Sequence, residues 1–382
     1  MPAGGRRVRT GHRASDVKTL LLASASVIVA CGVFAGGIDM SGQPVTLIFE
    51  DGDYVEVGLA YWMPTVVGVD PLGGKSGNVY SNVTGLSAGL KRQINDRWSA
   101  GLVVDQPYGV IVSYDLVYPD TTFPYAGTRA EPESLAVTGL VRYRIDDRFS
   151  VHGGLRAERF GGKVTLAGAG FDAVGLGGYT WTGSEDWGLG FVVGAAYEIP
   201  AIALRVALTY GSEIEHELDA TENFFGSSTT TVTMPQSVNL DFQTGVAPKT
   251  LLFGSVRWVN WAGWKVAPRG FTAATGAPLV EFEDDAFTYK LGLGRQITDR
   301  FSAAVEVSHE TARGQMMSPL DPYDGYTAIA IGGTYEAPSG LSLTGGVAYS
   351  ALGDAKVATP AGPAPFEDNH AVTVALAIGF RF

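Results

Sequence analysis

The stretch VRYRIDDRFSVHGGLRAER, Val141 to Arg159, alternates apolar and polar residues on both sides of an acidic pair, Asp146-Asp147. Alternation with a period of two residues indicates β-strand. The acidic pair is typical of a tight turn, because Asp tolerates turn conformations and bonds to its own backbone. The stretch therefore predicts a β-hairpin with one apolar face. That face contains Val141, Tyr143, Ile145, Phe149, Val151 and Leu155.

The same turn motif recurs, as NDRWS (95–99) and TDRFS (298–302). Three more hairpins are predicted to turn at Pro200, Pro248 and Pro338. The connections between hairpins are long and rich in Gly, Pro, Thr and Asp: Pro119–Glu133, Gly161–Asp186, Glu213–Met234 and Ala262–Asp285. Short turns at one end and long loops at the other are typical of a bacterial outer-membrane barrel.

Six hairpins, a first strand near Tyr54–Met63 and a last strand at His370–Phe382 make about fourteen strands, an even number as this class requires. The predicted fold is therefore all-β: a transmembrane antiparallel β-barrel of about fourteen strands, with a short N-terminal plug. The barrel is expected over residues 54–382 and the plug over residues 36–53. The expected location is the bacterial outer membrane.

Composition supports this class and excludes others. The chain has 382 residues, of which 46% are apolar and 17% charged, with 51 glycines. Its mean hydropathy of +0.12 is too low for a bundle of membrane helices. Its net charge of -12 would repel nucleic acid, so no nucleic-acid partner is expected.

Residues 1–35 are predicted to be a signal peptide. Five basic residues precede the apolar run Thr19–Ala35, which ends in a small residue and has Val33 and Ala35 in the positions that a signal peptidase reads. The basic region is long, so the alternative start sites Met1 and Val17 stay open. Cys31, the one cysteine of the chain, is interpreted as part of the signal core. The mature protein would then have neither disulfides nor thiolate metal sites.

The last strand, HAVTVALAIGFRF, carries apolar residues at every second position and ends in Phe380-Arg381-Phe382. An apolar alternation that ends in a carboxyl-terminal Phe resembles the signal read by the outer-membrane assembly machinery. Phe380 and Phe382 are therefore predicted to form the assembly signal, with this machinery and the outer-membrane lipids, including lipopolysaccharide, as partners.

The chain resembles the FadL/TodX-type outer-membrane transporters of long-chain fatty acids and other hydrophobic compounds. The resemblance rests on the strand count, the three D-R turns, the stretch DQPYGVIVSY from Asp105 to Tyr114, and the terminal Phe. In that family an N-terminal hatch plugs the lumen, and an inward kink in the third strand opens a lateral route to the membrane. Here the hatch segment is short and lacks the Asn-Pro-Ala signature often found there.

The resemblance implies uptake of hydrophobic compounds by binding in the lumen and lateral release into the membrane. Pro107 and Gly109 are candidate gate residues, since Pro cannot donate a ladder hydrogen bond and Gly weakens a strand. The apolar residues of the plug are expected to touch the ligand, and a carboxylate ligand would need a basic partner. The candidate ligand-binding residues are Val45, Leu47, Ile48, Phe49, Arg142, Arg156 and Arg257.

Charged residues are expected along the lumenal wall, where both signs would form a neutralising network. They are Asp105, Arg142, Arg144, Arg156, Glu158, Arg205, Asp241, Arg257, Lys290, Glu306 and Glu310.

Two other functions stay open from the sequence: a general porin for hydrophilic solutes, and an outer-membrane lipid hydrolase. For a hydrolase, Ser150 with His152, or Ser308 with His309, are the available pairs. Ser308 and His309 are direct neighbours and would point to opposite faces of a strand. The histidines lack metal-ligand spacing, so neither a catalytic activity nor a metal or other cofactor is expected.

Overall fold

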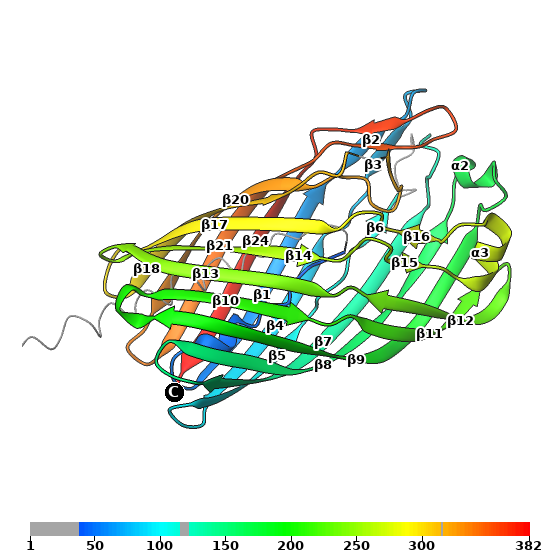
Figure 1. The fold of residues 1–382 in the computed structure, drawn as a ribbon. Helices are drawn as coiled ribbons and strands as arrows, with labels where there is room; N and C mark the ends of the chain where they lie inside the picture. Colours follow the sequence, from blue (N-terminus) through cyan, green and yellow to red (C-terminus); the bar gives the residue numbers. More distant parts are fainter. Residues whose placement is uncertain (1–37, 115–121, 315) are drawn as a thin grey trace, which may run out of the picture.

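The computed structural model describes residues 38–114, 122–314 and 316–382. The predicted signal peptide and Cys31 lie outside this range. The described chain is a closed antiparallel β-barrel (Figure 1), as predicted. Within this range, no helix is long and apolar enough to span a bilayer.

Fourteen strands form the wall, and the last one closes it by pairing with the first, from Tyr54 opposite Arg381 to Thr65 opposite His370. The wall strands are β1 (Tyr54–Thr65), β4 (Val83–Gln93), β5 (Trp98–Asp105), β7 (Arg129–Arg144), β8 (Phe149–Leu166), β9 (Tyr179–Ile199), β10 (Leu204–Gly211), β13 (Ser237–Ala247), β14 (Thr250–Val259), β17 (Ala286–Gln296), β18 (Phe301–Glu310), β20 (Tyr326–Glu336), β21 (Leu341–Leu352) and β24 (His370–Arg381).

All six predicted turns are confirmed, and they lie together at the end of the barrel where the connections are short. The recurring motif has a physical explanation, because its first residue accepts two backbone hydrogen bonds. Asp146 Oδ1 accepts from the amides of Arg148 and Phe149 at 2.7 and 2.8 Å. Asn95 Oδ1 accepts from the amides of Arg97 and Trp98, both at 3.0 Å. In the third copy, Thr298 Oγ1 accepts from the amides of Arg300 and Phe301.

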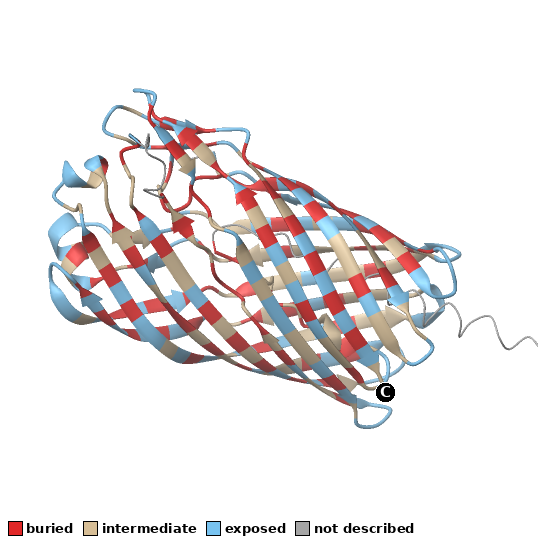
Figure 2. Cartoon of the chain, turned by 180° about the vertical axis from the view of Figure 1, so that it is seen from behind, coloured by how far each residue is buried: buried red, intermediate tan, exposed pale blue. Residues whose placement is uncertain are grey.

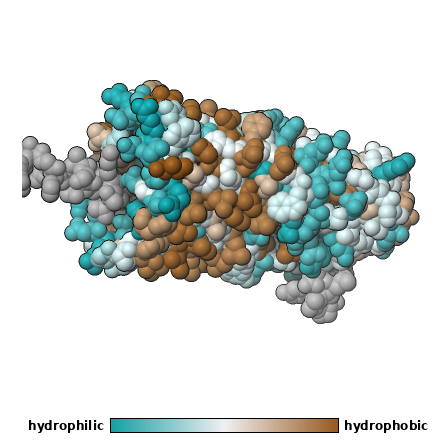
Figure 3. Space-filling view, turned by 90° about the horizontal axis from the view of Figure 1, so that it is seen from below, coloured by the Kyte–Doolittle hydropathy of each residue, from teal (hydrophilic) through white to brown (hydrophobic). Residues whose placement is uncertain are grey.

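Buried and exposed residues alternate along most strands of the wall (Figure 2), and the surface has an apolar belt between two hydrophilic ends (Figure 3). Leu155 and Leu189 are 74% and 80% exposed, as expected for side chains in hydrocarbon. The charged residues predicted for the lumenal wall are on the other face. Seven of them are buried and four, Arg144, Arg205, Asp241 and Lys290, are half-buried.

Several strands continue beyond the lengths expected from the sequence. The predicted loop Glu213–Met234 is mostly a hairpin, β11 (Ile214–Glu222) with β12 (Gly226–Met234), which prolongs β10 and β13 outward. Its sequence alternates polar with apolar residues but carries charges, because water rather than lipid faces this part of the sheet.

The remaining short elements cluster at this outer end. A small sheet joins β2 (Val67–Val69), β3 (Lys75–Asn78), β19 (Met316–Met317), β22 (Ala355–Val357) and β23 (Ala364–Phe366). Beside it lie β6 (Val112–Ser113), the pair β15 (Lys265–Val266) and β16 (Val280–Glu281), and the helices α2 (Ala169–Asp172) and α3 (Arg269–Thr275). At the opposite end are two 3₁₀ turns, η1 (Thr46–Phe49) before β1 and η2 (Pro200–Ile202) between β9 and β10.

Candidate functional site

The segment before β1 enters the lumen and pairs with the chain that follows β5. The Met40 amide donates to the Pro107 carbonyl at 2.8 Å, and the Gly109 amide donates to the Ile38 carbonyl at 2.9 Å. Asp39 forms a β-bridge with Tyr108 between them. On the β4 side, the third strand therefore leaves its neighbour after Asp105 and bonds the plug instead. On the other side it stays attached to β7, through Ser134, which bonds the Tyr108 backbone, and through a bridge between Gly109 and Glu133.

This inward kink interrupts the ladder between β4 and β5. Residues 83–87 of β4 pair with β1 on one side, but the register with β5 begins only at Ala88 opposite Val104. Gln106 fills part of the interruption, because its side-chain oxygen accepts a hydrogen bond from the Leu86 amide at 2.9 Å. Farther out the chains rejoin, where the Ser81 amide donates to the Ile111 carbonyl at 2.9 Å. The wall therefore has a gap that is bounded at both ends.

Pro107 and Gly109, the two candidate gate residues, lie in the inward segment. Pro107 has no amide hydrogen to offer a neighbouring strand. Gly109 is close to the plug: a Cβ at this position would lie 2.7 Å from Met40 Sδ. Glycine at 109 therefore lets the plug and the kink approach closely.

A cavity of about 280 Å³ lies between the plug and the wall on this side of the barrel. Small residues of β1 and β4, such as Gly58, Gly85 and Gly89, make room for it. Its lining also includes Leu59 and Leu86, whose side chains are on the lipid-facing surface and are 41% and 56% exposed. We call this cavity the exit chamber, because it connects the lumen with the gap.

A second pocket, of about 60 Å³, lies at the outer end and is almost wholly apolar. It surrounds Ile38, the first described residue of the plug, with aromatic side chains from four regions of the chain: Tyr80, Phe160, Trp181, Trp264 and Phe282. None of these was predicted from the sequence. The one available signal was the cluster of aromatics in the loop 260–285, where Trp264 and Phe282 stack at 5.0 Å.

One carboxylate borders this outer pocket. Asp321 Oδ1 accepts a hydrogen bond from the Tyr80 hydroxyl at 3.2 Å, and Oδ2 lies 3.4 Å from the Arg313 guanidinium. Burial raises the pKa of Asp321 to about 6, against the opposite effect of Arg313. This loop carboxylate is therefore partly protonated near pH 6.

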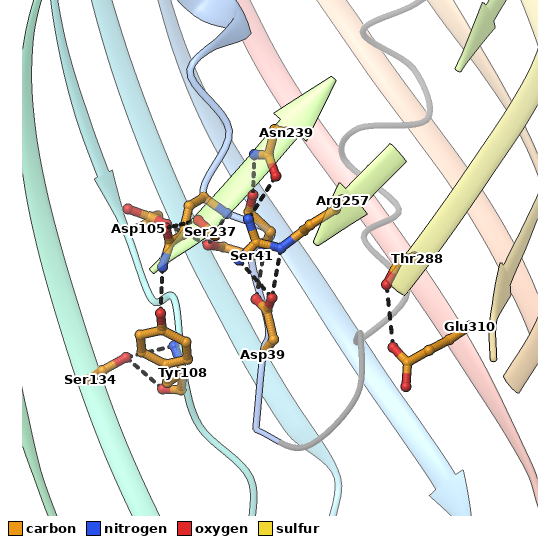
Figure 4. A network of polar contacts seen from close by, with 12 residues as sticks. Asp39, Ser41, Asp105, Tyr108, Ser134, Ser237, Asn239, Arg257, Thr288 and Glu310 are labelled. Atoms are coloured by element: carbon orange, nitrogen blue, oxygen red, sulfur yellow. Dashed lines mark hydrogen bonds and ion pairs between the residues drawn. The ribbon is translucent and has the colours of Figure 1, made fainter. Parts of the chain in front are cut away.

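Polar side chains of the wall hold the plug in place (Figure 4). Arg257 donates to the Asp39 carboxylate at 2.8 Å, and both residues are buried. Gln43 accepts from Arg156 at 2.5 Å and donates to the Tyr108 hydroxyl at 2.6 Å. Two predicted ligand-binding arginines thus have partners in the plug.

The part of the plug nearest to β1, Val45 to Phe49, packs against the inner face of the wall. The ring of Phe49 lies 4.6 Å from the Arg142 guanidinium and 4.8 Å from that of Arg205, a favourable cation–π geometry. Arg142 also pairs with Glu198. Of the other candidate residues, Val45 and Ile48 are buried against the wall, and Leu47 lines the exit chamber.

The side chains considered for catalysis have other contacts. Ser150 accepts a hydrogen bond from Arg142 at 3.0 Å, and His152 contacts Thr209 at 2.9 Å. Ser308 is buried and His309 is exposed, on opposite faces of β18. The described ranges contain no group of three His, Cys, Asp or Glu side chains that could hold a metal ion.

A closed barrel with a lipid-facing apolar belt is the architecture of an outer-membrane protein. Residues 74–363 match the family model described as "Outer membrane protein transport protein (OMPP1/FadL/TodX)". The chain belongs to this family, as the sequence resemblance suggested, and its location is the outer membrane. No curated protein sequence matches the chain at a significant level.

Solved structures show the same fold. A FadL homologue from Pseudomonas aeruginosa superposes with a TM-score of 0.70 at 15% identity, covering 91% of this chain and 96% of that one. The toluene transporter TodX from P. putida gives 0.64 at 13% identity, with 89% and 92% covered. The toluene transporter TbuX from Ralstonia pickettii gives 0.60 at 13% identity, with 93% and 97% covered. The structural relatives are transporters rather than enzymes.

Proposed function

We propose that this protein takes up hydrophobic compounds, such as long-chain fatty acids or monoaromatic hydrocarbons, and releases them sideways into the outer membrane. The compound would bind first in the outer pocket, pass the plug into the exit chamber, and leave through the gap between β4 and the kinked segment. The observation that carries this proposal is the interrupted ladder at residues 83–87, which borders a cavity with lipid-facing Leu59 and Leu86 in its lining.

Energetics favour the sideways route. Burial of each methylene group is worth about 0.8 kcal/mol, so a long apolar chain gains little by entering the aqueous periplasm. The plug segment also favours a gated channel over an open porin, because Asp39 and Gln43 have buried contacts with Arg257 and Arg156 of the wall. We propose transport without catalysis, since the Ser and His candidates are engaged elsewhere.

The proposed ligand contacts are Leu47 and the aromatic residues of the outer pocket, with Pro107 and Gly109 as the gate. Val45, Ile48, Phe49, Arg142, Arg156 and Arg257 act, in this proposal, mainly by holding the plug that controls access. Phe380 and Phe382 would serve recognition by the assembly machinery, and lipopolysaccharide would surround the outer half of the apolar belt. The side chains of Phe380 and Phe382 are on the lipid-facing surface and are 39% and 56% exposed.

A disulfide across the gap tests the route. Leu86→Cys with Gln106→Cys, in mature protein without other cysteines, should lock the two edges together. We expect oxidation to stop uptake of a radiolabelled hydrophobic compound by intact cells and reduction to restore it. The matched control is Leu90→Cys with Leu102→Cys, which links the same two strands where they pair regularly. Undiminished uptake by the oxidised gap variant would exclude lateral release at this site.

A further inference from the structure

The exit chamber carries more negative than positive side chains. Its lining holds five carboxylates and three basic groups: Glu50, Glu56, Asp105, Asp241 and Glu306 against Arg205, Arg257 and Lys290. The basic groups already have partners. Arg257 binds Asp39, Arg205 binds Gln243 at 2.9 Å, and Lys290 interacts with Asp241 and Glu306. Carboxylates outnumber basic groups by two in the lining, even though Glu50 also pairs with Arg381, and this excess disfavours an anionic ligand.

One carboxylate oxygen in the chamber has no donor. Asp105 is 1% exposed, and its Oδ2 accepts a hydrogen bond from the Ser41 hydroxyl at 2.5 Å. Its Oδ1 is buried and has no hydrogen-bond partner among the described residues. Arg156, which interacts with it electrostatically, donates instead to Gln43 and Thr138. A buried carboxylate oxygen without a donor is costly, so it offers a strong hydrogen bond to any donor that reaches it.

The position of Asp105 makes this oxygen relevant to a passing ligand. Asp105 is the last residue of β5, where the ladder stops and Gln106 begins the gap. The chamber has a mixed lining, and its apolar side chains include Met40, Leu47, Leu59, Leu86 and Val103. An apolar ligand with a single hydrogen-bond donor matches these apolar side chains and the unpaired Asp105 oxygen.

We infer that the exit chamber is a subsite for uncharged hydrophobic compounds that carry a hydroxyl donor, with Asp105 as the specificity-determining acceptor, and that it disfavours carboxylate anions. This inference rests on the proposed function, because it assumes that the ligand passes through the chamber. It narrows the cargo from hydrophobic compounds in general to neutral ones, and favours alcohols and phenols over hydrocarbons of equal size.

Three probes of one shape separate these classes: toluene, p-cresol and the p-toluate anion. Binding to the purified, folded protein in detergent at pH 7.5 is measured by calorimetry. Because p-cresol can donate a hydrogen bond to the carboxylate and toluene cannot, we expect p-cresol to bind about tenfold more tightly than toluene. We expect p-toluate to bind more weakly than either.

Asp105→Asn keeps the side-chain shape and removes the charge. This variant should bind p-cresol about five- to tenfold more weakly and toluene with unchanged affinity, since a neutral acceptor forms a weaker hydrogen bond. Glu158→Gln is the matched control, because it removes a buried lumenal charge that does not line the chamber. It should keep the wild-type preference. Heat-modifiability on gels verifies folding, and Asp105→Ser replaces Asp105→Asn if the latter does not fold.

The outcomes are distinct. Equal binding of toluene and p-cresol by the wild type, or an unchanged ratio in the Asp105 variant, overturns the subsite and leaves the proposed transport intact. Tightest binding of p-toluate also overturns it, because the chamber would then select anions. If the wild type binds none of the three probes, the subsite fails, whereas the proposed function fails only if a long-chain fatty acid is not bound either.

Discussion

The Arg257 guanidinium lies 2.8 Å from the Asp39 carboxylate, and this contact joins the wall to the plug across 218 positions of the chain. Both side chains are buried, 8% and 0% exposed. Loss of one partner leaves an uncompensated buried charge, which costs about 3 to 5 kcal/mol in well-studied cases. The pair therefore determines how firmly the plug is held.

Arg257→Met should loosen the plug without unfolding the barrel, because the backbone ladder of β14 with β13 and β17 does not depend on this side chain. We expect a higher and more variable ion conductance in planar bilayers. Arg159→Met is the control, since its ion pair with Glu185 is partly exposed and worth at most about 1 kcal/mol. Equal conductance in wild type and Arg257→Met would show that other contacts suffice to hold the plug.

Gly109→Ala should force the Met40 side chain of the plug to move. The added methyl group would lie 2.7 Å from Met40 Sδ, which is too close for van der Waals contact. Met40→Ala removes the obstacle, so the double variant should recover much of the uptake lost in Gly109→Ala. Strong coupling in this double-mutant cycle is the expected result. Additive effects would mean that Gly109 acts through backbone freedom alone.

Deletion of Phe382 should reduce insertion into the outer membrane while export across the inner membrane continues. Its ring faces lipid, stacks on Phe380 at 6.0 Å, and completes the apolar edge of β24. The amount of heat-modifiable barrel in outer-membrane fractions measures insertion. Phe224→Ala is a suitable control, because this aromatic is also exposed, 47% against 56% for Phe382, but lies at the outer end. Normal insertion of the deletion variant would contradict the assigned signal.

The outer loop that contains Asp321 should become less stable as pH rises from about 4 to 6. Burial raises the pKa of Asp321 from its usual 3.8 to about 6, so the folded loop favours the protonated acid. The stability contributed by Asp321 is therefore complete below the unfolded pKa and is lost as pH rises through the folded one. Hydrogen exchange of residues 318–325, corrected for intrinsic rates, should show stronger protection at pH 4.5 than at pH 7.5. Asp321→Asn should abolish most of this difference, and an identical pH dependence in the variant would rule out Asp321 as its cause.

The barrel itself is a local consequence of the sequence. A period of two, interrupted by Asp146, Asn95 or Thr298, determines strands, turns and the lipid-facing side, because each feature depends on residues within one hairpin. The terminal strand is equally local. The outer extensions of the strands were mistaken for loops: β11 and β12 in full, and in part β7, β8 and β9, because their polar or glycine-rich sequences lack the apolar pattern of a membrane strand.

The plug, the outer pocket and the gap were decided by tertiary structure. The sequence indicated that Pro107 and Gly109 would disturb a strand, but their new partners, Ile38 and Met40, lie about 70 residues away in the chain. Likewise, Tyr80, Trp181 and Trp264 are far apart in the sequence and line one pocket only in the closed barrel. Alternation specifies which face a side chain occupies, whereas its neighbours across the lumen depend on strand register, closure and the path of the plug, which no local pattern encodes.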